Sequence, residues 1–140
     1  MNEQEFKDRT KRLGIQVIRL LDTLPMERTT DVLAKQLLRA ATSIGANYRA
    51  ACRGKSSADV IAKLSVVEEE ADETLYWLEV FSEAALIPRT VLAGLIADTD
   101  EVLAMTVASI KTLRVRGAEP RPNVLVVQSK IQNPKSKMRS

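Results

Sequence analysis

The sequence predicts an all-α protein, an antiparallel up-down four-helix bundle followed by an extended basic C-terminal tail. Apolar residues recur every three or four positions through four long segments, which is the period of a helix with one buried face. Proline or glycine interrupts the pattern between successive segments. A chain of 140 residues with 45% hydrophobic and 28% charged side chains has the ordinary composition of one globular domain. We therefore assign residues 1–116 to the bundle and residues 117–140 to the tail.

Proline, threonine and glycine mark the ends of the first two predicted helices. The first helix covers residues 7–24, and Pro25 ends it because proline disfavours helical geometry at the residue before it. The second helix is expected to start at a threonine N-cap, either Thr29 or Thr30, whose hydroxyl can accept a hydrogen bond from a free N–H of the first turn. It continues up to Gly54, a natural C-terminal stop.

Serine, proline and glycine mark the ends of the other two predicted helices. Ser56 or Ser57 can cap the third helix, which ends near Leu86. Pro88 interrupts that helix and suits the first turn of the fourth, which Gly117 closes. Four amphipathic helices joined by short turns bury their apolar stripes most simply by packing as antiparallel neighbours, and this predicts the up-down bundle.

The composition narrows both location and chemistry. No apolar run approaches the ~20 residues that span a bilayer, and the polar amino terminus lacks the features of a secretory signal. We therefore expect a cytoplasmic protein that makes no membrane contact. The single cysteine, Cys52, has no partner for a disulfide, and the sequence lacks histidine, the usual general base and transition-metal ligand. We predict no enzyme activity, no catalytic residue and no cofactor.

An acidic cluster in the third helix is the first place to look for carboxylate metal chemistry. Helical bundles can hold di-metal centres on inward-facing glutamates, usually together with Glu-x-x-His motifs. Here histidine is absent and no second helix offers a matching inward carboxylate. We predict no metal site and favour a solvated or salt-bridged face, with a carboxylate metalloenzyme as a testable alternative. The cluster consists of Glu68, Glu69, Glu70, Asp72 and Glu73.

Polar side chains line one side of the second helix and one side of the third. Those of the second helix, from Gln36 to Asn47, are spaced by three, four and four residues, which places them beside the apolar stripe. Antiparallel packing can bring Arg39 and Asn47 against carboxylates and hydroxyls of the third helix in a partly buried network, where charge-assisted hydrogen bonds hold the arginine to glutamate. We favour a network that fixes helix register or subunit contacts over a ligand site. The predicted network is Gln36, Arg39, Ser43, Asn47, Glu70, Glu73 and Trp77.

Positive charge gathers at both ends of the chain. Residues 1–55 hold 11 basic and 6 acidic side chains, residues 56–101 hold 2 and 11, and residues 102–140 hold 8 and 1. Basic residues on a helix surface usually contact only solvent. The uneven distribution of charge nevertheless makes RNA, DNA or an enzyme that acts on nucleic acid a possible partner. The sequence shows no aromatic stacking platform and no recognition-helix motif. The candidate nucleic-acid contacts are Lys7, Arg9, Lys11, Arg12, Arg19, Arg121, Lys130, Lys135, Lys137 and Arg139.

Two stretches of the second and third helices resemble a known bacterial family. Residues 36–48 read QLLRAATSIGANY, and residues 69–79 read EEADETLYWLE. In this order and separation they look like stretches of the four-helix bundle proteins related to those encoded in intervening sequences of 23S ribosomal RNA genes. The resemblance covers about residues 6–115 and leaves the tail out. One departure is that Asn47 is followed by Tyr48-Arg49-Ala50, where many members have Ile-x-Glu-Gly.

The resemblance implies a homo-oligomeric bundle, often a pentameric ring, with no assigned enzymatic activity. More distantly, the chain is similar to bundle proteins of diversity-generating retroelements, which are pentameric accessories that associate with a reverse transcriptase and nucleic acid. Exposed polar-aromatic faces and segregated charge agree with lateral self-association. We therefore expect a non-catalytic, pentameric scaffold or adaptor, with a nucleic-acid-binding accessory protein as the alternative.

Overall fold

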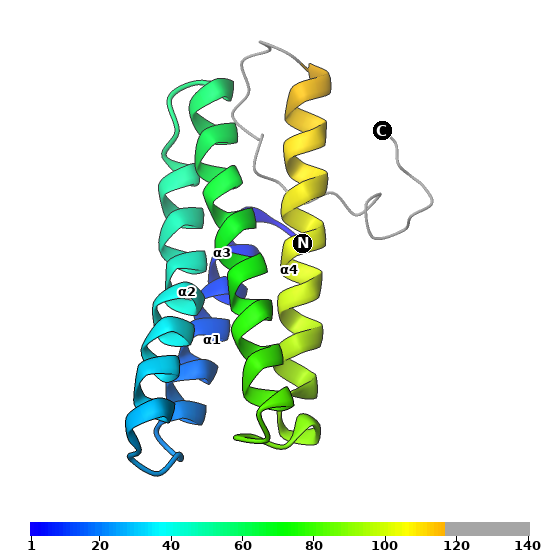
Figure 1. Ribbon diagram of the computed structural model, residues 1–140. Coiled ribbons are helices and arrows are strands. Elements are labelled where there is room, and N and C mark those ends of the chain that lie inside the picture. The colour runs from blue at the N-terminus through cyan, green and yellow to red at the C-terminus, as the bar shows by residue number, and fades with distance from the viewer. Residues whose placement is uncertain (117–140) are drawn as a thin grey trace.

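The computed structural model describes residues 1–116, which form four helices running alternately up and down (Figure 1). The helices are α1 (Glu3–Leu21), α2 (Arg28–Cys52), α3 (Ser57–Glu83) and α4 (Arg89–Arg116). Their packing within this part of the chain is that of a four-helix bundle, which confirms the predicted fold class. The predicted tail, with its five basic candidate residues, lies outside the described residues.

The helices pack in chain order around a shared core. Helix α2 packs against both α1 and α3, α3 also packs against α4, and a smaller contact between α1 and α4 closes the bundle. Helices α1 and α3 therefore lie diagonally across the core, and Figure 1 shows α1 behind α2 and α3. Across residues 1–116, no helix combines the length and the apolar character that a bilayer crossing needs.

Helix α1 begins four residues earlier than predicted because Asn2 caps it. The Asn2 side-chain oxygen accepts a hydrogen bond from the Glu5 N–H at 2.8 Å, and the Glu5 carboxylate accepts one from the Asn2 N–H at 2.8 Å. This reciprocal capping box satisfies two N–H groups that the first turn would otherwise leave free. The helix ends at Leu21, so the predicted end at residue 24 was too late.

The prediction of a threonine N-cap for α2 is wrong. The N-cap is Glu27, whose side chain makes no capping hydrogen bond, and both Thr29 and Thr30 lie inside the helix. Thr30 is buried there. The serine cap of α3 is confirmed, because the Ser56 hydroxyl accepts a hydrogen bond from the Asp59 N–H at 3.1 Å.

Helix α3 ends at Glu83, three residues before the predicted end, because the chain turns at Ala85. This residue has a φ of 60°, in the left-handed region that usually holds glycine. The N–H groups of Leu86 and Ile87 then donate to the carbonyl oxygen of Phe81 at 3.0 and 3.2 Å. This turn places the Ile87 side chain in the core, and α4 begins directly after Pro88.

A close approach of α1 and α2 shapes one side of the bundle. Phe6 of α1 and Tyr48 of α2 pack edge to face, with ring centroids 4.7 Å apart. Beside them, a Cβ atom added to Gly45 would lie 3.3 Å from the backbone of Thr10 and Lys11. Glycine at this position therefore allows the two helix backbones to come nearer than any larger side chain would permit.

Candidate functional site

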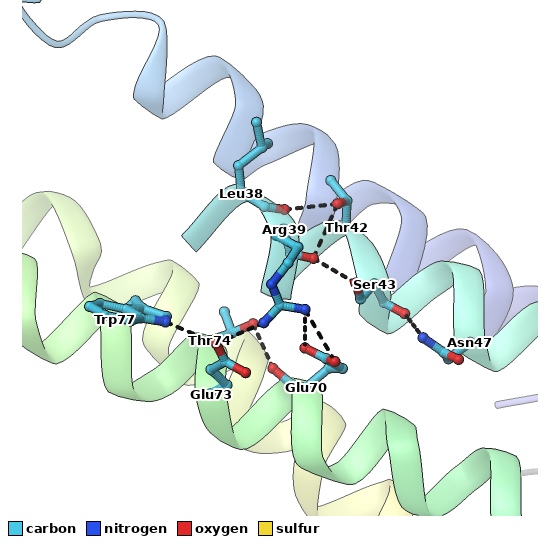
Figure 2. A network of polar contacts seen from close by, with 9 residues as sticks. All are labelled: Leu38, Arg39, Thr42, Ser43, Asn47, Glu70, Glu73, Thr74 and Trp77. Carbon is cyan, nitrogen blue, oxygen red and sulfur yellow. Dashed lines mark hydrogen bonds and ion pairs between the residues drawn. The ribbon is translucent and has the colours of Figure 1, made fainter. Parts of the chain in front are cut away.

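Arg39 of α2 lies between two carboxylates of α3. Its Nη2 atom donates to Oε2 of Glu73 at 2.7 Å, and its Nη1 atom lies 3.3 Å from Oε1 of Glu70 (Figure 2). The Arg39 side chain is 49% exposed and that of Glu70 is 18% exposed, so the cluster sits on the surface of the α2–α3 seam. Antiparallel packing of α2 and α3, which the short turn between them predicts, brings these three side chains together.

Trp77 completes this cluster through the same glutamate. Its indole Nε1–H donates to Oε2 of Glu73 at 3.2 Å, so that one oxygen accepts from two side chains (Figure 2). The hydrogen bond from Arg39, followed by that from Trp77, holds the pKa of Glu73 below its usual value. The two carboxylates correspondingly raise the pKa of the Arg39 guanidinium. These charged and polar contacts join α2 to α3, and we call their four residues, Arg39, Glu70, Glu73 and Trp77, the clasp.

The other predicted network members on α2 do not reach the carboxylates. The Ser43 hydroxyl donates to the carbonyl oxygen of Arg39 at 2.6 Å, and the Asn47 side-chain amide donates to the carbonyl of Ser43 at 2.9 Å (Figure 2). Both are therefore bound within their own helix. Gln36 is exposed and makes no side-chain hydrogen bond within residues 1–116.

The basic candidates of α1 divide between two sides of the bundle. Arg9 turns toward α4, where its Nη2 atom pairs with Glu101 and lies 3.6 Å from Oδ1 of Asp98. With its side chain 15% exposed, Arg9 joins α1 to α4. Sequence reasoning missed these two carboxylates as its partners, although their i, i+3 spacing on one face of α4 was a usable signal.

The remaining basic candidates of α1 are nearer to solvent. Lys7 pairs with Glu3 at 3.7 Å, one turn earlier in the same helix. Lys11, Arg12 and Arg19 are exposed and make no ion pair within the described part of the chain. Within residues 1–116, three cationic side chains of α1 are therefore available to an anionic partner.

A groove of about 480 Å³ runs along the outer face between α1 and α2, and we call it the α1–α2 groove. Gly14 and Gly45 are among its lining residues, and a Cβ atom added at Gly14 or Gly45 would lie 3.4 or 3.3 Å from the facing helix, so the two helices pack closely there. Sequence reasoning missed this groove. The available signal was one glycine in the interior of each helix, where glycine otherwise costs about 1 kcal/mol relative to alanine. Its charged and apolar walls include Lys7, Asp8, Lys11, Ile15, Ile18 and Arg49.

Within residues 1–116, the groups that could carry chemistry include carboxylate clusters, the Cys52 thiol and the Tyr48 hydroxyl. In residues 1–116, no cluster of three or more histidine, cysteine, aspartate or glutamate side chains has a geometry that could hold a metal ion. Burial raises the pKa of the Cys52 thiol to about 11, with a further contribution from Glu3, so the thiol is protonated at neutral pH. Burial also raises the pKa of Tyr48.

Comparison with known proteins gives a family and one informative structure. The model of the family described as 23S rRNA-intervening sequence protein matches residues 2–108. A crystal structure of a protein of unknown function from the S23 ribosomal protein family of Bacteroides thetaiotaomicron is 35% identical, with a TM-score of 0.74. The match covers 79% of this chain and 99% of that one. No protein with a curated description matches. The chain therefore belongs to the family of 23S rRNA-intervening sequence proteins.

Proposed function

We propose that this protein is a non-catalytic, homo-oligomeric helical-bundle scaffold or adaptor of the cytoplasm. The observation that carries the proposal is the exposure of large apolar side chains in the middle of helices, on two faces of the bundle. Ile15 and Ile18 of α1 are 37% and 41% exposed, and Tyr76 of α3 is 57% exposed. Such side chains gathered on a surface mark sites of protein association. Five subunits is the number that the family resemblance implies.

The clasp of Arg39, Glu70, Glu73 and Trp77 supports this role by rigidifying one seam of the bundle. Trp77 also packs edge to face with Tyr76, with ring centroids 4.9 Å apart, so the clasp orients an exposed aromatic ring. A scaffold must present its contact faces at a fixed angle for a ring to close. In this proposal the clasp fixes the register of α2 and α3 and carries no ligand.

Light scattering on the purified protein tests the proposal directly. We expect a mass that is a small multiple of the 15.5 kDa chain, five times for a pentamer, unchanged by added structured RNA. A mass of one chain at all concentrations would overturn the scaffold proposal.

The alternative function is a nucleic-acid-binding accessory protein. It is favoured by Lys11, Arg12 and Arg19 of α1, which form no ion pair within residues 1–116. Phosphate contacts release counterions, so affinity for structured RNA would fall steeply with salt. Deleting residues 117–140 would weaken binding further in this case, because five of the candidate contacts lie there. An affinity for RNA that does not change with salt concentration, or no binding at low salt, would remove this alternative.

A further inference from the structure

The α1–α2 groove is positively charged at one end and apolar at the other. Lys7, Lys11 and Arg49 line the first part, against one carboxylate, Asp8. Lys11 and Arg49 form no ion pair with any described residue. Toward the other end, Ile15 and Ile18 leave more than a third of their surface exposed. The groove therefore fits a partner that carries both negative charge and an apolar or aromatic group.

Helix α3 displays a surface of this kind, which we call the α3 stripe. Its members are spaced by three, four, three and four residues, so they share one face of the helix. All are exposed, and none of its carboxylates pairs with a basic side chain in residues 1–116. The only apolar group in the stripe is the ring of Tyr76. The stripe consists of Glu69, Asp72, Tyr76, Glu79 and Glu83.

The groove and the stripe match in length but belong to opposite sides of one molecule. The groove lining reaches from Gln4 to Ile18, and the stripe reaches from Glu69 to Glu83. At 1.5 Å of rise per residue, each covers about 21 Å of helix. Helices α1 and α3 lie diagonally across the core (Figure 1). The exposed face of α3 and the groove between α1 and α2 therefore belong to different sides of one molecule. Only a second copy can bring the two surfaces into contact.

We propose that the α3 stripe of one molecule docks in the α1–α2 groove of a second copy of this chain. This inference rests on the proposed homo-oligomer and names the two surfaces that form it. The carboxylates of Glu69 and Asp72 pair with Lys11 and Arg49, and the ring of Tyr76 covers the exposed isoleucines. Different surfaces meet in this contact, so it is head to tail, and a closed ring results where the rotation between subunits closes.

Charge-swap variants test the docking in the full-length protein. Lys11→Glu with Arg49→Glu reverses the groove, and Glu69→Lys with Asp72→Lys reverses the stripe. Each pair alone is expected to reduce the mass measured by light scattering to 15.5 kDa, the mass of one chain. Combining all four substitutions restores opposite charges across the contact and is expected to restore the oligomer. Circular dichroism checks whether each variant keeps its helices. We expect that it does, because all four substituted side chains are exposed.

A matched control reverses two exposed cations of α4 that belong to neither surface. Arg89→Glu with Lys111→Glu makes the same change in net charge as the groove variant and is expected to keep the wild-type mass. Three results overturn the docking while leaving the scaffold standing: full mass in either single-surface variant, no recovery in the combined variant, or equal loss in the control. A groove variant that keeps its mass but loses binding to structured RNA would assign the groove to nucleic acid. A monomeric wild type refutes the scaffold itself.

Discussion

Arg39 and Glu73 form a 2.7 Å ion pair across the α2–α3 seam, and the glutamate oxygen in that pair also accepts the indole N–H of Trp77. A shift of α2 against α3 by one turn would break the Arg39–Glu73 contact, whereas the Glu73–Trp77 hydrogen bond lies within α3 and orients the glutamate that Arg39 meets. A surface ion pair is worth little by itself. Here the pair constrains the register of α2 against α3, because it joins Arg39 of α2 to the glutamate that also accepts a hydrogen bond from Trp77 of α3.

Replacing Arg39 with alanine removes the bridge from α2 to both carboxylates. We expect a loss of about 0.5–1 kcal/mol in the free energy of unfolding, because the pair is partly exposed and screened by solvent. Urea denaturation measures this loss, and light scattering shows whether assembly loosens with it. Lys35→Ala is the control, since Lys35 is more exposed and, among the residues that the structure describes, pairs only with Asp31 in its own helix. Unchanged stability and unchanged mass in the Arg39 variant would remove the structural role assigned to the clasp.

The stability contributed by Glu73 depends on pH in a defined direction. The folded-state pKa of Glu73 is lowered by Arg39 and Trp77, so its contribution is full above the unfolded value of about 4.3. The contribution is lost as the pH falls through the lower folded value. We expect wild type to be more stable than Glu73→Gln at neutral pH and this difference to vanish in acid. Urea midpoints at several pH values measure it.

Asp100→Asn provides the comparison for that experiment. Asp100 is an exposed residue of α4 that lies outside the α3 stripe and forms no ion pair with a described residue, so its substitution is expected to give a small difference at every pH. Equal pH profiles for the two variants would mean that Glu73 gains nothing from its partners.

The sequence was sufficient for the fold because the apolar period and the positions of proline and glycine agree along the chain. The sequence also predicted that Arg39 lies opposite Glu70 and Glu73, since short turns make neighbouring helices antiparallel. Prediction failed for helix ends and turns, which local backbone interactions determine, and for contacts between residues far apart in the chain. Neither the cap by Asn2 nor the left-handed turn at Ala85 has an apolar signature. The partners of Arg9 lie about ninety residues away, and the groove depends on how closely two backbones approach.

The contact of Arg9 with Asp98 and Glu101 should stabilise the weakest seam of the bundle, between α1 and α4. Substituting Arg9 with methionine keeps the apolar stem and removes the charge, so we expect a loss of about 1 kcal/mol in unfolding free energy. Arg12→Met in the same helix is the control, because Arg12 is exposed and makes no ion pair within residues 1–116. Thermal unfolding followed by circular dichroism separates the two variants, and equal melting temperatures would contradict the assignment.

Ala85 holds a left-handed conformation that costs an L-residue about 1–2 kcal/mol and glycine almost nothing. Ala85→Gly is therefore expected to stabilise the protein by about 0.5–1 kcal/mol, since the greater flexibility of glycine in the unfolded chain offsets part of the relief. The neighbouring Ala84 has a φ of −81°, so Ala84→Gly relieves nothing and is expected to destabilise by about 0.5–1 kcal/mol. Urea denaturation of both variants beside wild type measures the opposite signs. Destabilisation by both glycines would mean that the turn after α3 carries no backbone strain at Ala85.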